Sequence, residues 1–200
     1  MSSRRPPAAA AASPSAFPFT KLLVFLTLGL IVTSRMLASR AKSSAPSSVA
    51  YVVVAHALTY PSLGEALLAA LVLYQLRVME VACGPSKYGG LVVCCGLIGY
   101  GLEAVLGRLV DVSGASGLHP VIFSLLVGYF LDVPRQSRFS LFGVGLSDKS
   151  FLYGMAGWLA VVHGGRSLLS AGSGVIGGYL YWGSGVLQRV AVPEGLVAWL

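Results

Sequence analysis

The residues best able to do chemistry are a serine between small residues and three histidines. Ser116 lies in the run Gly114-Ala115-Ser116-Gly117, and a serine is a poor nucleophile unless a base accepts its proton. His119 follows Ser116 by three residues at a helix entry, His163 ends an apolar segment, and His56 falls in a short one. Structural or headgroup roles are favoured for all three histidines, so no base for Ser116 is evident.

A second polar group ends an apolar run in the stretch Tyr74–Tyr88. Arg77 and Glu80 are spaced i, i+3 and therefore share a helix face, where they can satisfy each other as a membrane helix leaves the bilayer. Gly84 and Pro85 are expected to stop this helix. We expect Arg77 and Glu80 to form a structural polar pair, or to share backbone carbonyls, and to order the turn at Gly84.

The elements that must position these residues are apolar helices. Hydrophobic residues make up 56% of the 200 residues and charged residues 10%, and the mean hydropathy is +0.78, which excludes an ordinary water-soluble domain. A spanning helix needs about 20 residues. Six segments are predicted to span, the fourth and fifth being short: Phe19–Leu37, Ser62–Val81, Gly89–Val110, Leu118–Val133, Lys149–His163 and Leu168–Leu187. The sequence thus predicts an all-α membrane protein with a six-transmembrane-helix bundle.

The placement of basic residues predicts that both termini are cytosolic. With six spans, the termini share a side that carries eight basic residues, and the other side carries five. They are Arg4, Arg5, Lys21, Lys87, Arg135, Arg138, Lys149 and Arg189 against Arg35, Arg40, Lys42, Arg108 and Arg166. The net charge of +7 is therefore assigned to anionic lipid headgroups, and no basic stripe with interleaved aromatics indicates nucleic acid.

Glu103 is an acid inside the third predicted span. An intramembrane acid is costly in lipid and must face the protein interior or pair, so we expect an internal hydrogen-bonded role, with Arg108 five residues further on.

Cys83, Cys94 and Cys95 are odd in number and two are adjacent, which favours neither a disulfide scaffold nor a zinc site. No metal and no cofactor are expected.

The chain divides into three parts by composition. Residues 1–16 are rich in Ala, Pro and Ser and contain no acid, which predicts a disordered or targeting N-terminus. Residues 17–187 form the predicted transmembrane domain, and residues 188–200 an interfacial C-terminal segment. The first acid of the whole chain is Glu65, so an organelle transit sequence stays open beside a retained first membrane helix.

Several short motifs together resemble the rhomboid-like family, and most closely its ubiquitin-associated-domain-containing members, which are relatives of Derlins. They are Phe17–Leu23, Tyr74–Tyr88, Ser116-Gly117 with Pro120–Phe123, Val133–Arg135, Asp148–Ser150, and Ser173-Gly174 followed by Pro193 and Trp199. The resemblance implies a rhomboid-like bundle over the membrane part. It also implies a ubiquitin-associated domain after it, which residues up to Leu200 do not include; a truncation and a loss of that domain both stay open.

The resemblance also implies how the serine would be used. The run Gly114–Gly117 matches the GxSG sequence that holds the nucleophile of rhomboid proteases, whose base is a histidine in an H-x-x-G-x-x-x-G pattern on the sixth span. Gly174 and Gly178 reproduce the two helix-packing glycines of that pattern, but Ala171 occupies the histidine position. A fold that has lost catalysis is therefore expected, with no catalytic residue and no enzyme activity.

These inferences predict a non-catalytic scaffold in the lipid bilayer that binds membrane proteins. The resemblance implies endoplasmic-reticulum quality control (ERAD), with ubiquitin-ligase components or client proteins as partners. Two alternatives stay open. One is an accessory structural subunit of a large membrane complex, for example in the mitochondrial inner membrane, and the other is an active intramembrane serine protease that uses Ser116.

Overall fold

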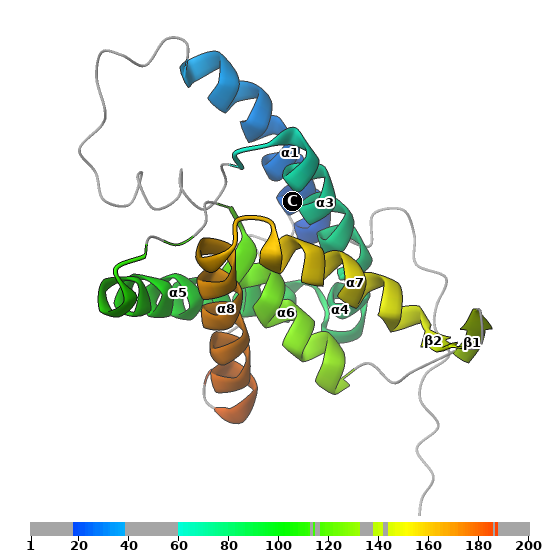
Figure 1. Ribbon diagram of the computed structural model, residues 1–200. Helices are drawn as coiled ribbons and strands as arrows, with labels where there is room; N and C mark the ends of the chain where they lie inside the picture. Colours follow the sequence, from blue (N-terminus) through cyan, green and yellow to red (C-terminus); the bar gives the residue numbers. More distant parts are fainter. Residues whose placement is uncertain are drawn as a thin grey trace, which may run out of the picture.

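The computed structural model describes residues 18–38, 60–112, 114, 117–132, 138–141, 144–185 and 187. Its elements are α1 (Pro18–Ala38), α3 (Leu63–Gln75), α4 (Arg77–Cys83), α5 (Pro85–Val110), α6 (His119–Asp132), β1 (Arg138–Leu141), β2 (Val144–Ser147), α7 (Asp148–Val161) and α8 (Gly165–Gly183) (Figure 1). Each of the six predicted apolar segments contains a helix. The antiparallel hairpin of β1 and β2 was not predicted.

The second and third predicted spans are joined through two short breaks. Leu76 separates α3 from α4, and Gly84, with φ +84°, is the single residue between α4 and α5. The stop predicted at Gly84 is therefore confirmed, but Pro85 starts the next helix at once, because proline suits the first turn. Leu63–Cys83 and Pro85–Val110 are long and apolar enough to cross a membrane, whereas the part Pro18–Gly29 of α1 and the helix His119–Asp132 are shorter apolar stretches.

Helices α5, α6 and α8 form the centre of the bundle, with α7 crossing one side of it (Figure 1). Small residues allow the close approach of these helices. A Cβ atom on Gly99 of α5 would lie 2.7 Å from Cβ of Pro120 in α6. Most of α6 is buried, including Val121, Ile122 and Leu125, which belong to the main hydrophobic core. The core thus surrounds α6.

Polar contacts gather at the two ends of the bundle. At one end, here called the Glu80 end, Glu80 of α4 meets Thr20 of α1. At the other, the His119 end, Glu65 of α3 meets His163, which lies between α7 and α8. Helix α1 therefore begins at the Glu80 end, whereas α3 begins at the His119 end and α4 continues it to the Glu80 end, so α1 and the α3–α4 segment run in opposite directions.

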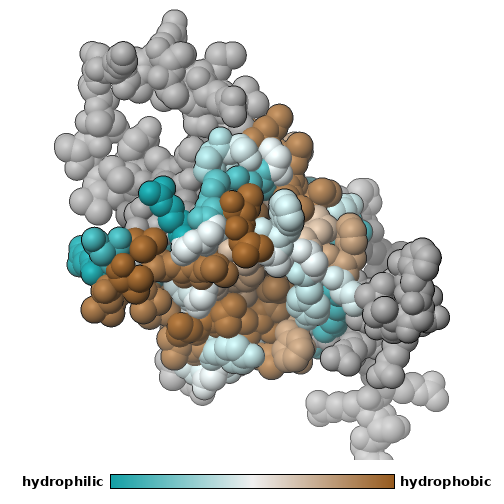
Figure 2. All heavy atoms as spheres, in the orientation of Figure 1, coloured by the Kyte–Doolittle hydropathy of each residue, from teal (hydrophilic) through white to brown (hydrophobic). Residues whose placement is uncertain are grey.

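The outer surface is strongly apolar. Figure 2 shows hydrophobic residues over much of the visible described surface. On α3 and α4 the exposed apolar side chains recur every three or four residues and so form one stripe: Leu63, Leu67, Leu71, Tyr74, Val78 and Val81. A contiguous apolar stripe of this length requires an apolar environment, and a bilayer supplies it.

Candidate functional site

The candidate site lies at the His119 end, where the chain passes from α5 to α6. Ser116 itself lies outside the described residues, and its neighbours Gly114 and Gly117 are described. The Tyr100 hydroxyl donates a hydrogen bond to the carbonyl of Gly117 at 2.9 Å. Gly117 has φ +114°, and a Cβ atom there would overlap the ring of Tyr60, so glycine is required at this position.

Tyr60 and His119 are buried in the interior of the bundle at this end. The Tyr60 hydroxyl accepts a hydrogen bond from the backbone N–H of Leu118 at 2.9 Å, and its burial raises the pKa of this phenol. The His119 side chain is fully buried, with its ring centroid 5.7 Å from that of Tyr60. Both rings therefore hold the first turn of α6 in place.

Glu103 lies beside this junction on α5. It is 7% exposed, so the prediction that it faces the interior is confirmed. The Ser170 side chain of α8 lies close to its carboxyl group, and the Ser170 hydroxyl donates a hydrogen bond to the carbonyl of Arg166 at 3.2 Å. Gly114 lies directly against the same carboxyl, because a Cβ atom on Gly114 would overlap it. Arg108, one turn further along α5, is exposed.

The position expected to carry a catalytic histidine is apolar. Ala171 of α8 is buried and packs with Phe123 of α6 and Ala156 of α7. His163, at the same end of the bundle, directs Nε2 to Oε2 of Glu65 at 2.8 Å. Its backbone N–H donates to the Ser167 hydroxyl at 3.1 Å. The position on α8 where a catalytic histidine was expected therefore carries no base.

The two glycines of the predicted packing pattern lie at the contact between α6 and α8. A Cβ atom on Gly174 would be 2.5 Å from the carbonyl oxygen of Pro120, and one on Gly178 would be 3.0 Å from Cα of Ser124. The Ser124 hydroxyl also donates to the carbonyl of Gly174 at 2.7 Å. Both glycines thus bring the two helix backbones together.

Arg77 and Glu80 lie at the opposite end of the bundle, away from the candidate site. Glu80 accepts hydrogen bonds from the backbone N–H groups of Phe19 and Thr20, at 3.0 and 2.9 Å, and from the Thr20 hydroxyl at 2.6 Å. Arg77 contacts the hydroxyl of Tyr74 and lies 4.2 Å from the centre of its ring. Pairing of Arg77 with Glu80 stays a prediction.

The role of Glu80 as a remote cap of α1 was missed from the sequence. Helix N-termini need acceptors for their first N–H groups, and α1 starts at Pro18 after a phenylalanine, with no acid in its first turn. The absence of a local cap was the one available signal. It indicated that an acceptor was needed. It did not indicate which residue supplies the acceptor, because Glu80 lies 60 residues after Thr20 in the sequence.

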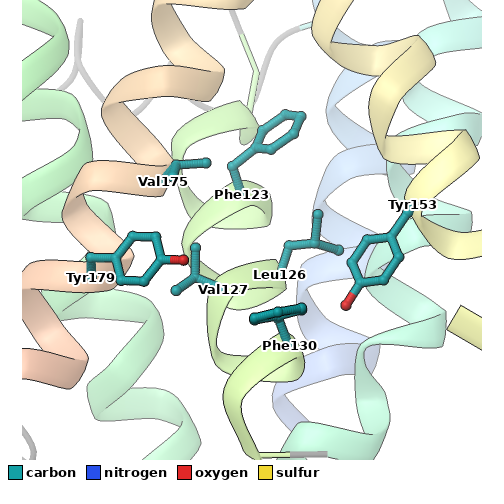
Figure 3. A pocket seen from close by; sticks show the side chains of 7 residues that line it. All are labelled: Phe123, Leu126, Val127, Phe130, Tyr153, Val175 and Tyr179. Carbon is teal, nitrogen blue, oxygen red and sulfur yellow. The ribbon is translucent and has the colours of Figure 1, made fainter. Parts of the chain in front are cut away.

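An apolar groove lies on another face of α6 (Figure 3). Its volume is about 210 Å³, and it is open to one side. The lining side chains come from α6, α7 and α8: Phe123, Leu126, Val127, Phe130, Tyr153, Val175 and Tyr179. Among the described residues, no three His, Cys, Asp or Glu side chains are grouped to hold a metal ion.

The chain is similar to a curated protein of a plant. The chain is 32% identical over 133 residues to Rhomboid-like protein 18 of Arabidopsis thaliana. The match covers 64% of this chain and 46% of the relative, so the chain spans about half the length of the protein it matches. No protein-family model matches, and no solved structure matches. This similarity supports a rhomboid-like family and, with the apolar helices, indicates a membrane protein.

Proposed function

We propose that this protein is a non-catalytic rhomboid-like scaffold that binds membrane partners in the quality-control system of the endoplasmic reticulum. The observation that carries the proposal is the environment of Ala171. This residue stands at the expected histidine position and is packed against Phe123 and Ala156. Its methyl group accepts no proton, and general-base assistance is typically worth about 10²- to 10⁴-fold in rate.

The two described histidines have other surroundings, which supports the same proposal. Nε2 of His163 is engaged by Glu65, and His119 is buried beside Tyr60. A catalytic base also needs a free nitrogen within hydrogen-bond reach of the serine it activates. The contact with Glu65 occupies Nε2 of His163, so that nitrogen is taken within the fold.

The lengths of the helices support a role as a scaffold. Helices α6 and α7 have 14 residues each, which corresponds to about 21 Å at 1.5 Å per residue. A hydrocarbon core is about 30 Å thick, and α7 exposes Phe151 and Trp158, so lipid beside this short helix must thin. Partner helices that carry polar residues are costly in a full-thickness bilayer and gain from such a zone. The groove between α6, α7 and α8 opens beside these short helices and offers a contact surface.

The loss of catalysis is tested with a fluorophosphonate probe, which labels activated serines. We expect no labelling of the wild-type protein and the same background in Ser116→Ala. Partner binding, measured by crosslinking in microsomal membranes, should be unchanged in Ser116→Ala. Labelling of the wild type that Ser116→Ala abolishes would show an active serine and refute the proposal.

The scaffold role is tested by filling the groove. Val175 lines the groove, and Val175→Trp should reduce crosslinking to membrane partners severalfold. Ile176 is the next residue, is 46% exposed and does not line the groove, so Ile176→Trp is the matched control. Equal crosslinking in wild type, Val175→Trp and Ile176→Trp would remove the groove from the proposal.

An accessory subunit of a large complex in the mitochondrial inner membrane is the second candidate. The acid-free sequence before Glu65, with Arg4 and Arg5 near its start, favours it, because mitochondrial targeting segments are basic and poor in acids. Fluorescence microscopy of a C-terminally tagged protein separates the two locations. A mitochondrial pattern, together with comigration in a large complex on native gels, would replace the endoplasmic-reticulum proposal.

A further inference from the structure

The apolar groove between α6, α7 and α8 has the size of one aromatic side chain. Its volume is about 210 Å³. A dry apolar cavity of about 150 Å³ holds one benzene molecule, whereas pockets for drug-sized ligands have about 300–1,000 Å³. The groove therefore has room for a single ring with its attached methylene group, and it is too small for a drug-sized molecule.

The walls of the groove are largely aromatic. Helix α6 forms the floor, with Phe123 and Phe130 at its two ends, and Tyr179 of α8 and Tyr153 of α7 lie on opposite sides (Figure 3). Phe130 and Tyr179 are both 54% exposed, so their rings border the opening. Aromatic rings attract each other in tilted or offset pairs with centroids about 4.5–7 Å apart. Four rings around a ring-sized space favour an aromatic occupant over an aliphatic one.

Two glycines beside the groove leave room for the backbone of a partner helix. A Cβ atom on Gly157 of α7, or on Gly172 of α8, would meet nothing within 4 Å. Gly157 follows Tyr153 by four residues and Gly172 precedes Tyr179 by seven, so each glycine shares a helix face with a residue that lines the groove. A helix that approaches across these small residues can place a large side chain in the groove.

We propose that the groove binds one phenylalanine side chain from the transmembrane helix of a partner protein. This inference rests on the proposed scaffold function and names the residue by which the partner is held. Lipid tails are as apolar as leucine, so an apolar surface alone gives a partner helix no preference for the groove over lipid. Contacts between rings do give such a preference, and an aromatic side chain seated in a pocket often dominates an interface.

The depth of the groove makes the proposal specific. Val175 lines the groove and lies at the middle of the 19-residue helix α8. A side chain that reaches Val175 from a spanning helix of about 20 residues therefore lies near the middle of that helix. Phenylalanine suits this depth because its ring, unlike those of tyrosine and tryptophan, carries no polar group that needs a hydrogen-bond partner.

The experiment measures the binding of synthetic helices to the full chain in nanodiscs by energy transfer. The probes are Leu/Ala helices of about 21 residues whose central residue is phenylalanine, cyclohexylalanine or alanine. Cyclohexylalanine has nearly the size of phenylalanine but no aromatic ring, so it separates ring contacts from the filling of space. We expect the phenylalanine probe to bind about threefold more tightly than the cyclohexylalanine probe, and on the order of tenfold more tightly than the alanine probe.

Variants of the protein identify the groove. Tyr179→Leu removes one ring from the wall and should lower the preference for phenylalanine over cyclohexylalanine. Phe151→Leu removes a ring that is 68% exposed on α7 and does not line the groove, so this matched control should keep the preference. Val175→Trp fills the groove and should make the three probes bind equally. Gly172→Leu should weaken binding of the phenylalanine probe severalfold, because its side chain holds the partner backbone away.

The results separate this inference from the scaffold proposal. Equal binding of the phenylalanine and cyclohexylalanine probes, no binding of any probe, or a preference that persists in Tyr179→Leu overturns the inference, and Tyr179→Leu decides this even where Val175→Trp fails to fold. A phospholipid found by native mass spectrometry on the wild type but not on Val175→Trp would make a lipid chain the occupant. A dimer lost in Val175→Trp would make the occupant a second copy. Either result also overturns the inference, whereas reduced partner crosslinking of Val175→Trp in microsomes would still leave the scaffold function standing.

Discussion

Glu80 and Glu103 are both buried acids in apolar helices, and their surroundings differ. Glu80 receives three hydrogen bonds from Phe19 and Thr20, so both carboxylate oxygens are used within the fold. Glu103 has one oxygen without a partner among the described residues. Sequence alone singled out both acids because charged residues are rare in this chain. It could not tell which of the two acids has both oxygens hydrogen-bonded within the fold, because that depends on which distant N–H and O–H groups reach each oxygen.

Replacement of Glu80 tests its role as a cap of α1. Glu80→Gln puts an amide NH₂ beside the N–H groups of Phe19 and Thr20, so at least one buried donor loses its acceptor. We expect the free energy of unfolding to fall by about 1–3 kcal/mol, measured by reversible denaturation in mixed detergent micelles. Arg77→Gln, one turn away and on the more exposed side, is the control and should cost less. Equal losses in the two variants would instead favour the predicted Arg77–Glu80 pair.

Tyr60 offers a second test at the scale of a single atom. Tyr60→Phe removes the hydroxyl that accepts from the Leu118 N–H, leaving a buried donor unsatisfied next to α6. The expected loss of stability is about 1–3 kcal/mol, again read from denaturation in micelles. Tyr179→Phe removes a hydroxyl from a half-exposed side chain and should be nearly neutral. A neutral Tyr60→Phe would show that this contact does not hold the start of α6.

At the scale of elements, the contact between α6 and α8 depends on the absence of side chains at two positions of α8. Gly174 and Gly178 approach the backbone of α6, whereas a Cβ atom on Gly172 of the same helix would meet nothing within 4 Å. This difference allows helix propensity to be separated from packing within one helix, since alanine is a better helix former than glycine at every position.

Alanine substitutions along α8 should therefore have opposite effects. Gly174→Ala should destabilise the protein by about 1–3 kcal/mol through overpacking against Pro120, and Gly178→Ala should cost less, because its nearest contacts are at 3.0 rather than 2.5 Å. Gly172→Ala should be neutral or stabilising by up to about 1 kcal/mol. Thermal denaturation in detergent measures all three. A loss in Gly172→Ala as large as in Gly174→Ala would point to glycine flexibility instead of close packing.

The positions of the elements could be predicted from hydropathy, but their ends and connections only in part. The segment Ser62–Val81 corresponds to α3 and α4. The amino-acid composition gave no indication of the break between them at Leu76. The hairpin had a signal that was not used: Arg138-Phe139-Ser140-Leu141 alternates polar and apolar residues, and only two residues separate Leu141 from its partner Val144. Short strands are easily overlooked beside long apolar runs.

At the scale of the whole molecule, the two ends of the helix bundle can be assigned to the two sides of the membrane. Lys149 of α7 donates to the carbonyl of Tyr129 in α6 at 3.0 Å, which joins two helix ends flanking the hairpin. With the termini in the cytosol, as the basic residues predict, the hairpin is cytosolic and the His119 end faces the lumen. The six-span arrangement on which this rests stays a prediction.

Glycosylation mapping checks this orientation. An acceptor sequence inserted between β1 and β2 should stay unmodified in microsomes, and one inserted between Arg40 and Ser48 should be glycosylated. The reason is that lumenal enzymes reach only the side opposite the basic excess. The second insertion serves as the positive control for the first. Modification of the hairpin insertion would invert the topology and would place Glu103 near the cytosolic side.

The cap of α1 by Glu80 also has a consequence for biosynthesis. The first turn of α1 is made 60 residues before the acid that completes it. At about 5–20 residues per second, the ribosome needs roughly 3–12 s to add those residues. During this interval the first helix is in the translocation machinery with its N-terminal amides unsatisfied by the chain. We therefore expect its final seating to await the emergence of α4, which makes the order of synthesis part of how this membrane domain assembles.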